Sequence, residues 1–204
     1  MKDNYAIQAQ QAKQRFLTYD QEALSRKLGL ETDEEYLYTA LFSHRYRIHR
    51  VDGSFSRLSP EGWVDANSFS EVMTLLDLIC DSRDDRRLSG QWKNMRDFGS
   101  LFYSNKAAPT RDPDADHFAA DPEGFAAACR AFGGVPLPQG DVGYSIPVFE
   151  GLPIGLQLWL GDEDFPAQLK LMWDANALQY LRFETMHYAV GLLMQLLKEE
   201  MKRL

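Results

Sequence analysis

The chain has 204 residues, 45% of them hydrophobic and 25% charged, which excludes a wholly disordered protein because enough apolar surface is available to offset chain entropy. The net charge of −8 argues against a nucleic-acid partner, since a phosphate backbone is held by a surplus of Lys and Arg. No apolar run follows the start at Met1-Lys2-Asp3-Asn4, and none elsewhere is long enough for a bilayer, so we expect a cytoplasmic protein without membrane contact.

The first thirty residues predict two helices. Over residues 4–17 the apolar side chains recur at helical spacing, at Tyr5, Ala9, Ala12 and Phe16. Thr18 and Gln21 have the spacing of a capping box, which predicts a second helix that runs to Leu28. Gly29 then supplies a left-handed stop.

Residues 36–57 change to the two-residue period of strands. Residues 36–41 and 45–51 are predicted as strands, and Asp52-Gly53 as the hairpin turn before a returning strand at Phe55. Within the second strand Tyr46 and Ile48 face one way, whereas Arg45, Arg47 and His49 face the other. The pattern indicates a small antiparallel meander with a cationic face.

The middle of the chain is mixed. A capping box of Ser68 with Glu71 opens a helix that ends near residue 81. Residues 107–122, dominated by Pro, Asp and Ala, are predicted as a loop, and Asp121-Pro122 begins a short helix after it.

The C-terminal part predicts a second sheet. Residues 144–149, 154–160 and 168–173 are strand-like and are separated by short turns, and residues 176–201 form a final helix that is apolar nearly all round. Short turns favour antiparallel pairing, so the fold class is α+β, with antiparallel sheets packed against helices and a long buried C-terminal helix. We expect a single domain over residues 1–204, with 1–105 and 121–204 as its possible halves.

Several sequence runs resemble a known family. They are Ile146-Pro147-Val148-Phe149, Leu158-Trp159-Leu160-Gly161-Asp162-Glu163-Asp164-Phe165-Pro166-Ala167, Leu171-Met172-Trp173-Asp174, Phe16-Leu17 and Asp33-Glu34-Glu35-Tyr36-Leu37. These resemble an uncharacterised prokaryotic domain of unknown function, found largely in anaerobic bacteria and archaea and sometimes annotated near corrinoid iron–sulfur proteins. The resemblance implies an accessory protein of an anaerobe. It supplies no catalytic residues, and the added cysteine domain of longer members is absent from this sequence.

Two groups of residues are candidates for ligand binding. Arg45, Arg47 and His49 share one strand face and have the chemistry to grip a carboxylate or phosphate. Trp92, Trp159 and Trp173 have the flat apolar rings that line a pocket for a planar ligand. The alternatives are a solvated strand face for the first group and core packing for the second.

One group of residues is a candidate for metal binding or acid–base catalysis. It comprises Asp162, Asp164, Asp174, Glu184 and His187. Carboxylates at turns and strand ends can converge on a hard cation, and Glu-x-x-His spacing places two ligands one helical turn apart. The alternatives are an acidic turn, a helix N-cap at Asp174 and a core histidine.

No phosphate-binding glycine loop, nucleophile elbow or zinc-protease motif is present in the sequence. The leading hypothesis is therefore a small-molecule or cofactor-binding accessory protein of anaerobic metabolism. A metal-dependent enzyme that uses Asp162, Asp164, Asp174 and His187 is one alternative, and a protein-interaction subunit with an exposed apolar patch is the other. The sequence leaves the ligand, any cofactor and the oligomeric state open.

Overall fold

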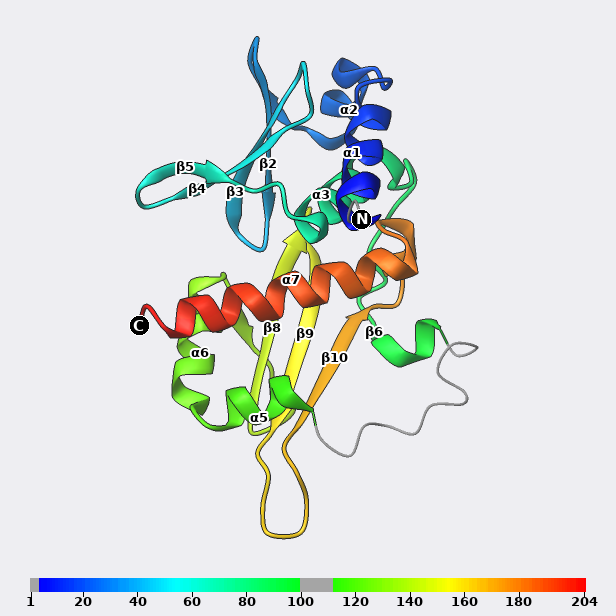
Figure 1. Cartoon of the computed structure of the whole chain (residues 1–204). Coiled ribbons are helices and arrows are strands. Elements are labelled where there is room, and N and C mark those ends of the chain that lie inside the picture. The colour runs from blue at the N-terminus through cyan, green and yellow to red at the C-terminus, as the bar shows by residue number, and fades with distance from the viewer. Residues whose placement is uncertain (1–3, 100–111) are drawn as a thin grey trace. The chain divides into compact units, whose positions relative to one another are not determined.

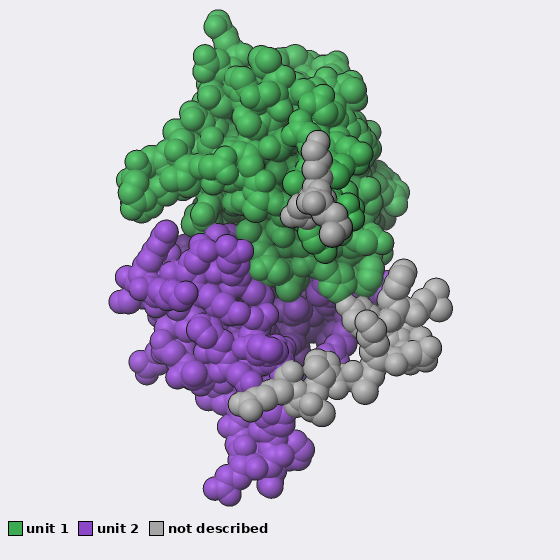
Figure 2. Space-filling model, viewed as in Figure 1, with its two compact units in different colours: residues 1–87, 178–192 green, residues 88–177, 193–204 purple. Residues whose placement is uncertain are grey.

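The computed structural model describes residues 4–99 and 112–204, which form two compact units (Figure 2). The first unit runs to Arg87 and includes Leu178–Leu192, and the second contains Leu88–Ala177 and Leu193–Leu204. Each unit has its own five-stranded antiparallel sheet, which confirms the α+β class. Residues 88–99 supply a strand to the second sheet, and residues 178–192 belong to the first unit. The halves expected at 1–105 and 121–204 stay a prediction.

The sheet of the first unit follows chain order. Its strands are β1 (Glu31–Thr32), β2 (Tyr36–Leu41), β3 (His44–His49), β4 (Phe55–Ser59) and β5 (Gly62–Asp65) (Figure 1). Short connections join them, and Phe42 and Ser43 between β2 and β3 both have positive φ, 51° and 63°, as a two-residue type I′ hairpin turn requires. The predicted meander is confirmed, with two strands that the sequence did not indicate, β1 and β5.

Helices close one side of this sheet. The helices of the unit are α1 (Asn4–Phe16), α2 (Gln21–Leu28), α3 (Phe69–Leu76), the π-helical turn η1 (Asp77–Asp81) and the first part of α7 (Phe183–Met201). The capping box of Ser68 with Glu71 and the left-handed stop at Gly29 are confirmed. The capping box predicted at Thr18 is wrong, because the N-cap of α2 is Asp20, whose side chain accepts the amide of Ala23.

The core of the first unit explains which sheet face is open. Alternate side chains of β2 and β3 are fully buried, namely Leu37, Leu41, Tyr46 and Ile48. They belong to the same buried core as side chains of the helices, such as Phe16 and Leu75. Because successive strand side chains point to opposite faces, the residues between them lie on the other face of the sheet.

The sheet of the second unit has the order β6-β10-β9-β8-β7. Its strands are β6 (Trp92–Asn94), β7 (Val135–Pro136), β8 (Val142–Phe149), β9 (Leu152–Trp159) and β10 (Gln168–Asp174), and short 3-10 turns lie at Met95–Phe98 and Ala177–Gln179. Helices α5 (Pro113–Ala119) and α6 (Pro122–Ala131) contribute Phe118 and Phe125 to its core, where Leu156 and Trp173 are also fully buried. The sheet predicted for residues 142–174 is confirmed.

Two expectations about helices were wrong. The stretch predicted as a loop contains α5, because Asp112 accepts the amide of Asp114 as N-cap and Pro113 occupies the first turn. The C-terminal helix begins at Phe183 rather than 176, and its exposed side chains follow one stripe through Glu184, His187, Gly191 and Gln195. Among the described residues, no helix combines the length and the apolar character that crossing a membrane requires.

Candidate functional site

The open face of the first unit's sheet carries three aromatic rings and three basic side chains. Tyr36 and Tyr38 come from β2, Arg45, Arg47 and His49 from β3, and Trp63 from β5. The register pairs Tyr36 with His49 and Tyr38 with Arg47, so these side chains stand on the same face. We call the six residues the aromatic–arginine face. The prediction that Arg45, Arg47 and His49 lie opposite the buried Tyr46 and Ile48 is confirmed.

Arg47 is stacked between two rings at the centre of this face. Its guanidinium carbon lies 4.2 Å from the ring centroid of Tyr36 and 4.5 Å from that of Trp63. Its Nε is buried without a hydrogen-bond partner, and no carboxylate among the described residues forms an ion pair with it. The stack therefore holds a planar, permanently charged donor group in place, and carboxylate and phosphate oxygens are the acceptors that match this group.

Arg45 already has an anionic partner on the same face. Its guanidinium lies 4.9 Å from the Tyr38 ring centroid, and Nη2 is 2.6 Å from Oε2 of Glu31. The Arg45 and Glu31 side chains are 47% and 69% exposed, so their ion pair contributes at most about 1 kcal/mol. A stronger anion can displace Glu31 at little cost.

Tyr38 is oriented by Asp33. The Tyr38 hydroxyl donates to Oδ2 of Asp33 at 2.7 Å, while Oδ1 accepts the amides of Glu35 and Tyr36. The hydrogen bond from Tyr38, and then those from the two amides, hold the pKa of Asp33 below its usual value. Asp33 therefore stays ionised at neutral pH and keeps the Tyr38 ring in a fixed position.

His49 is the last residue of β3 and lies on the aromatic–arginine face next to the turn between β3 and β4. Its Nδ1 lies 3.0 Å from Oδ1 of Asp52, and its ring centroid is 5.4 Å from that of Tyr36. His49 thus has a carboxylate partner and supports Tyr36, whereas Arg47 is the basic group of this face that no described carboxylate pairs with.

The sequence analysis missed the aromatic part of this face. Tyr36 and Tyr38 could have been found from strand alternation, because Leu37 between them is buried and its two neighbours point to the other face. Trp63 was not, because the short strand β5 has no strong strand pattern of its own, and its ring reaches Arg47 only through the pairing of β3, β4 and β5.

Trp92 and Trp159 do not join this face and do not share a pocket. Both belong to the second unit, where Trp92 pairs with Asp174 at one end of β10 and Trp159 with Gln168 at the other. At about 3.3 Å per residue, these ends are about 20 Å apart. The Trp159 ring is covered by the Lys170 ammonium at 4.3 Å, and the Trp92 ring lies against Gly155. The register of β10 therefore separates Trp92 from Trp159 within the second sheet.

Asp162 and Asp174, two of the carboxylates proposed as metal ligands, accept hydrogen bonds from backbone amides. Oδ1 of Asp162 accepts the amides of Asp164 and Phe165. Asp174 accepts the amides of Ser89, Gly90 and Asn176 and the Ser89 hydroxyl, at 2.8 to 3.0 Å. Burial opposes ionisation of Asp174, but these hydrogen bonds outweigh it and lower its pKa.

The other two proposed ligands, Glu184 and His187, belong to the first unit and stand on the exposed stripe of α7. Within residues 4–99 and 112–204, no three side chains of His, Cys, Asp or Glu are grouped so that they could hold a metal ion. The residues predicted to share a metal site are therefore not brought together in the part of the chain that is described.

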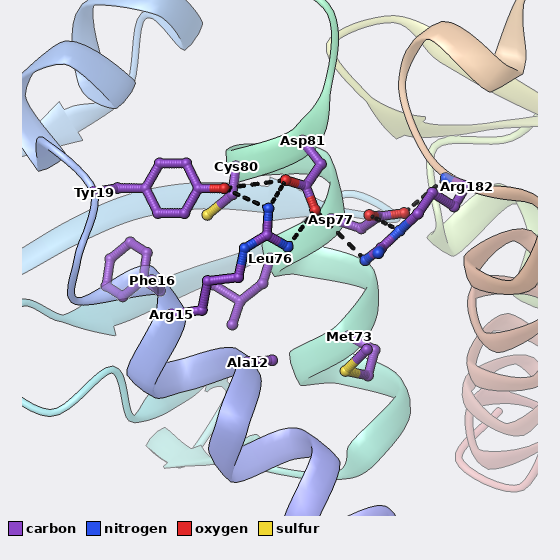
Figure 3. Close-up of a pocket in the computed structure, with 10 residues that line it drawn as sticks. All are labelled: Ala12, Arg15, Phe16, Tyr19, Met73, Leu76, Asp77, Cys80, Asp81 and Arg182. Atoms are coloured by element: carbon purple, nitrogen blue, oxygen red, sulfur yellow. Dashed lines mark hydrogen bonds and ion pairs between the residues drawn. The ribbon is translucent and has the colours of Figure 1, made fainter.

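A small pocket lies beside the π-helical turn (Figure 3). Arg15 binds the Asp81 carboxylate through both Nη atoms at 2.5 and 3.0 Å, and Arg182 Nε lies 2.7 Å from Oδ1 of the fully buried Asp77. π-Helical turns often mark functional sites, but this pocket has a volume of about 20 Å³, enough for one water molecule. Its two arginines are balanced by two aspartates. These ion pairs hold α1 and Arg182 against η1.

Cys80, which also lines this pocket, is not activated as a nucleophile. Burial, and then the charge of Asp81, raises the pKa of the Cys80 thiol to about 12. A thiol with that pKa is protonated at neutral pH, and the thiolate is the reactive form.

No curated protein and no solved structure matches the chain. The sequence model of a family described as a domain of unknown function, DUF3786, matches residues 20–196. The match includes both sheets and begins after α1, and it confirms the predicted resemblance to an uncharacterised domain family.

Proposed function

We propose that this chain, which belongs to the DUF3786 family, binds a small ligand that carries a carboxylate or phosphate group. The family is described as a domain of unknown function. The ligand would lie on the aromatic–arginine face. Its anionic group would accept hydrogen bonds from Arg47, and its flat or apolar part would cover the rings of Tyr38 and Trp63.

The stacked Arg47 is the observation that carries this proposal. An arginine that serves only the fold normally pairs with a carboxylate, as Arg45 does with Glu31 at 2.6 Å. Arg47 instead lies over two rings, at 4.2 and 4.5 Å, and forms no ion pair with a described carboxylate, although its charge helps to lower the pKa of Asp33. The stack restrains a side chain that would otherwise lose much rotamer entropy on binding, so a ligand meets a donor already in place.

The overall charge favours a small ligand over a polyanion. At a net charge of −8 the chain repels a long phosphate backbone, whereas one or two ligand charges can be balanced locally by Arg47 and by Arg45 once Glu31 is displaced. The accessory role in anaerobic metabolism and the cytoplasmic location belong to the same proposal, and they rest on the family resemblance and on the sequence. No observation favours the metal-dependent enzyme, and we do not propose it.

Benzoate and phenyl phosphate are suitable probes, with benzamide as the uncharged control. In NMR titrations of the isotopically labelled protein, we expect the two anions to shift amide signals of β2, β3 and β5, and benzamide to leave them unchanged. Arg47→Lys keeps the charge but removes the planar fork, and we expect about tenfold weaker binding from the loss of one charge-assisted hydrogen bond.

Arg83→Lys is the matched control, because Arg83 also lies in the first unit and forms an exposed ion pair with Asp85 at 2.8 Å. A dispersed spectrum shows that each variant is folded. The proposal is wrong if benzamide shifts the same amides as benzoate, or if Arg47→Lys binds both anions as well as Arg83→Lys does.

A further inference from the structure

The connection between β9 and β10 forms a tip beyond the strands (Figure 1). Two of its large apolar side chains are exposed. We call residues 160–167 the β9–β10 tip. Phe165 is 66% exposed and Leu160 is 41% exposed. Leu160, Phe165 and Pro166 line one groove, and exposed apolar side chains that are grouped in this way mark contact with another molecule, whereas single ones do not.

The tip has a defined conformation that presents Phe165 outward. The amide of Asp162 donates to the Phe165 carbonyl at 2.9 Å, and the Phe165 amide donates to Oδ1 of Asp162 at 2.7 Å. Gly161 approaches the backbone so closely that a Cβ there would come within 2.8 Å of the Ala167 nitrogen. A docking partner would therefore not have to order this backbone, which lowers the entropy cost of association.

The tip and α5 line an open groove of about 700 Å³. The volume of this groove is within the range of sites that hold small molecules, so it can also hold a side chain of a bound peptide. Its apolar surface comes from Leu160, Phe165 and Pro166 of the tip and from Ala119 and Ala120 at the C-terminal end of α5.

Every charged residue that the structure describes in the lining of the groove is acidic. These residues are Asp116 in α5 and Asp162, Glu163 and Asp164 in the tip, and no Lys, Arg or His is among the described lining residues. Apolar side chains within a field of one sign select a partner of the opposite charge and steer its approach.

We propose that this groove docks a basic peptide segment of a partner protein, with an apolar side chain seated against Phe165 and Leu160 and flanking Lys or Arg residues facing the carboxylates. A second copy of the chain is a poor occupant because it also carries a net charge of −8. A bare metal ion would leave Phe165 and Leu160 uncovered. The inference concerns the second unit and is independent of the proposed ligand on the aromatic–arginine face.

A fluorescein-labelled peptide of sequence Lys-Leu-Lys-Phe-Lys-Leu-Lys is the probe, and the same peptide with Glu in place of every Lys is its control. Fluorescence anisotropy with the full chain should show binding of the basic peptide only. We expect Phe165→Ala to weaken binding about tenfold, as loss of an aromatic anchor does, and Glu163→Gln about threefold.

Matched variants make the result specific. Val135→Ala shortens another exposed apolar side chain of the second unit, 62% exposed, and Asp97→Asn removes another exposed carboxylate there. Neither should change the affinity, and circular dichroism shows that each variant is folded. The proposal is overturned if the basic peptide fails to bind at about 1 mM, the weak limit for such segments, if the Glu peptide binds equally, or if Val135→Ala weakens binding as much as Phe165→Ala. It is also overturned if sedimentation shows that the chain self-associates through the tip, with dimers that Phe165→Ala dissociates.

Discussion

Replacing Asp77 should destabilise the first unit more than replacing any exposed aspartate in it. The Asp77 side chain has no exposed surface, and its Oδ2 accepts the amide of Arg182, just before α7, at 2.7 Å. A hydrogen bond to a charged group contributes about 1.5–3 kcal/mol, and the ion pair with the half-exposed Arg182 guanidinium adds less than about 1 kcal/mol. Asp77→Ala should therefore lower the free energy of unfolding by about 2–4 kcal/mol, because it also leaves the Arg182 amide without its acceptor.

Asp77→Asn separates the two contributions. It retains an oxygen that can accept the Arg182 amide but removes the charge, so we expect a loss of only about 1 kcal/mol. Urea unfolding followed by circular dichroism measures these differences, and hydrogen exchange of the first-turn amides of α7 should accelerate in Asp77→Ala. Asp85→Ala, which removes an exposed ion pair with Arg83, is the control and should cost less than about 0.5 kcal/mol. If Asp77→Ala were no more destabilising than Asp85→Ala, Asp77 would not anchor the start of α7.

Three further predictions follow from other parts of the chain. Gly161→Ala should disturb the β9–β10 tip, because its Cβ would come within 2.8 Å of the Ala167 nitrogen, and amide shifts of residues 160–167 should report this while the rest of the second unit is unchanged. Asp52, whose pKa is lowered to about 2 by hydrogen bonds from Ser54 and then His49, stabilises the folded state above its unfolded pKa near 3.8. That contribution is lost as pH falls from about 4 to about 2. Because the side chain is exposed, the change in unfolding free energy over this pH range should differ between Asp52→Asn and the unaltered protein by less than about 1 kcal/mol. Cys80 and Cys129, whose thiol pKa values are raised to about 12 chiefly by burial, should react slowly with Ellman's reagent at pH 8 in the folded chain and rapidly after unfolding, and fast reaction of the folded chain would contradict the raised pKa values.

Local patterns in the sequence determined much of the fold. Alternation in β3 placed Arg45, Arg47 and His49 opposite Tyr46 and Ile48, because a strand's side chains point to alternate faces whatever their neighbours are. The capping box of Ser68 with Glu71 started α3 for an equally local reason, since both partners lie within one helical turn. The sequence alone therefore identified the basic half of the aromatic–arginine face.

Contacts between distant residues were decided by the tertiary structure. Trp63 reaches Arg47 only because β3, β4 and β5 pair in one register, and the register of β10 is also what separates Trp92 from Trp159. Asp174 resembled a helix N-cap in the sequence, yet it binds the Ser89 amide, 85 residues away in the chain. Residue spacing specifies periodicity along one element, whereas the partner of a side chain depends on how strands and loops far apart in sequence are brought together.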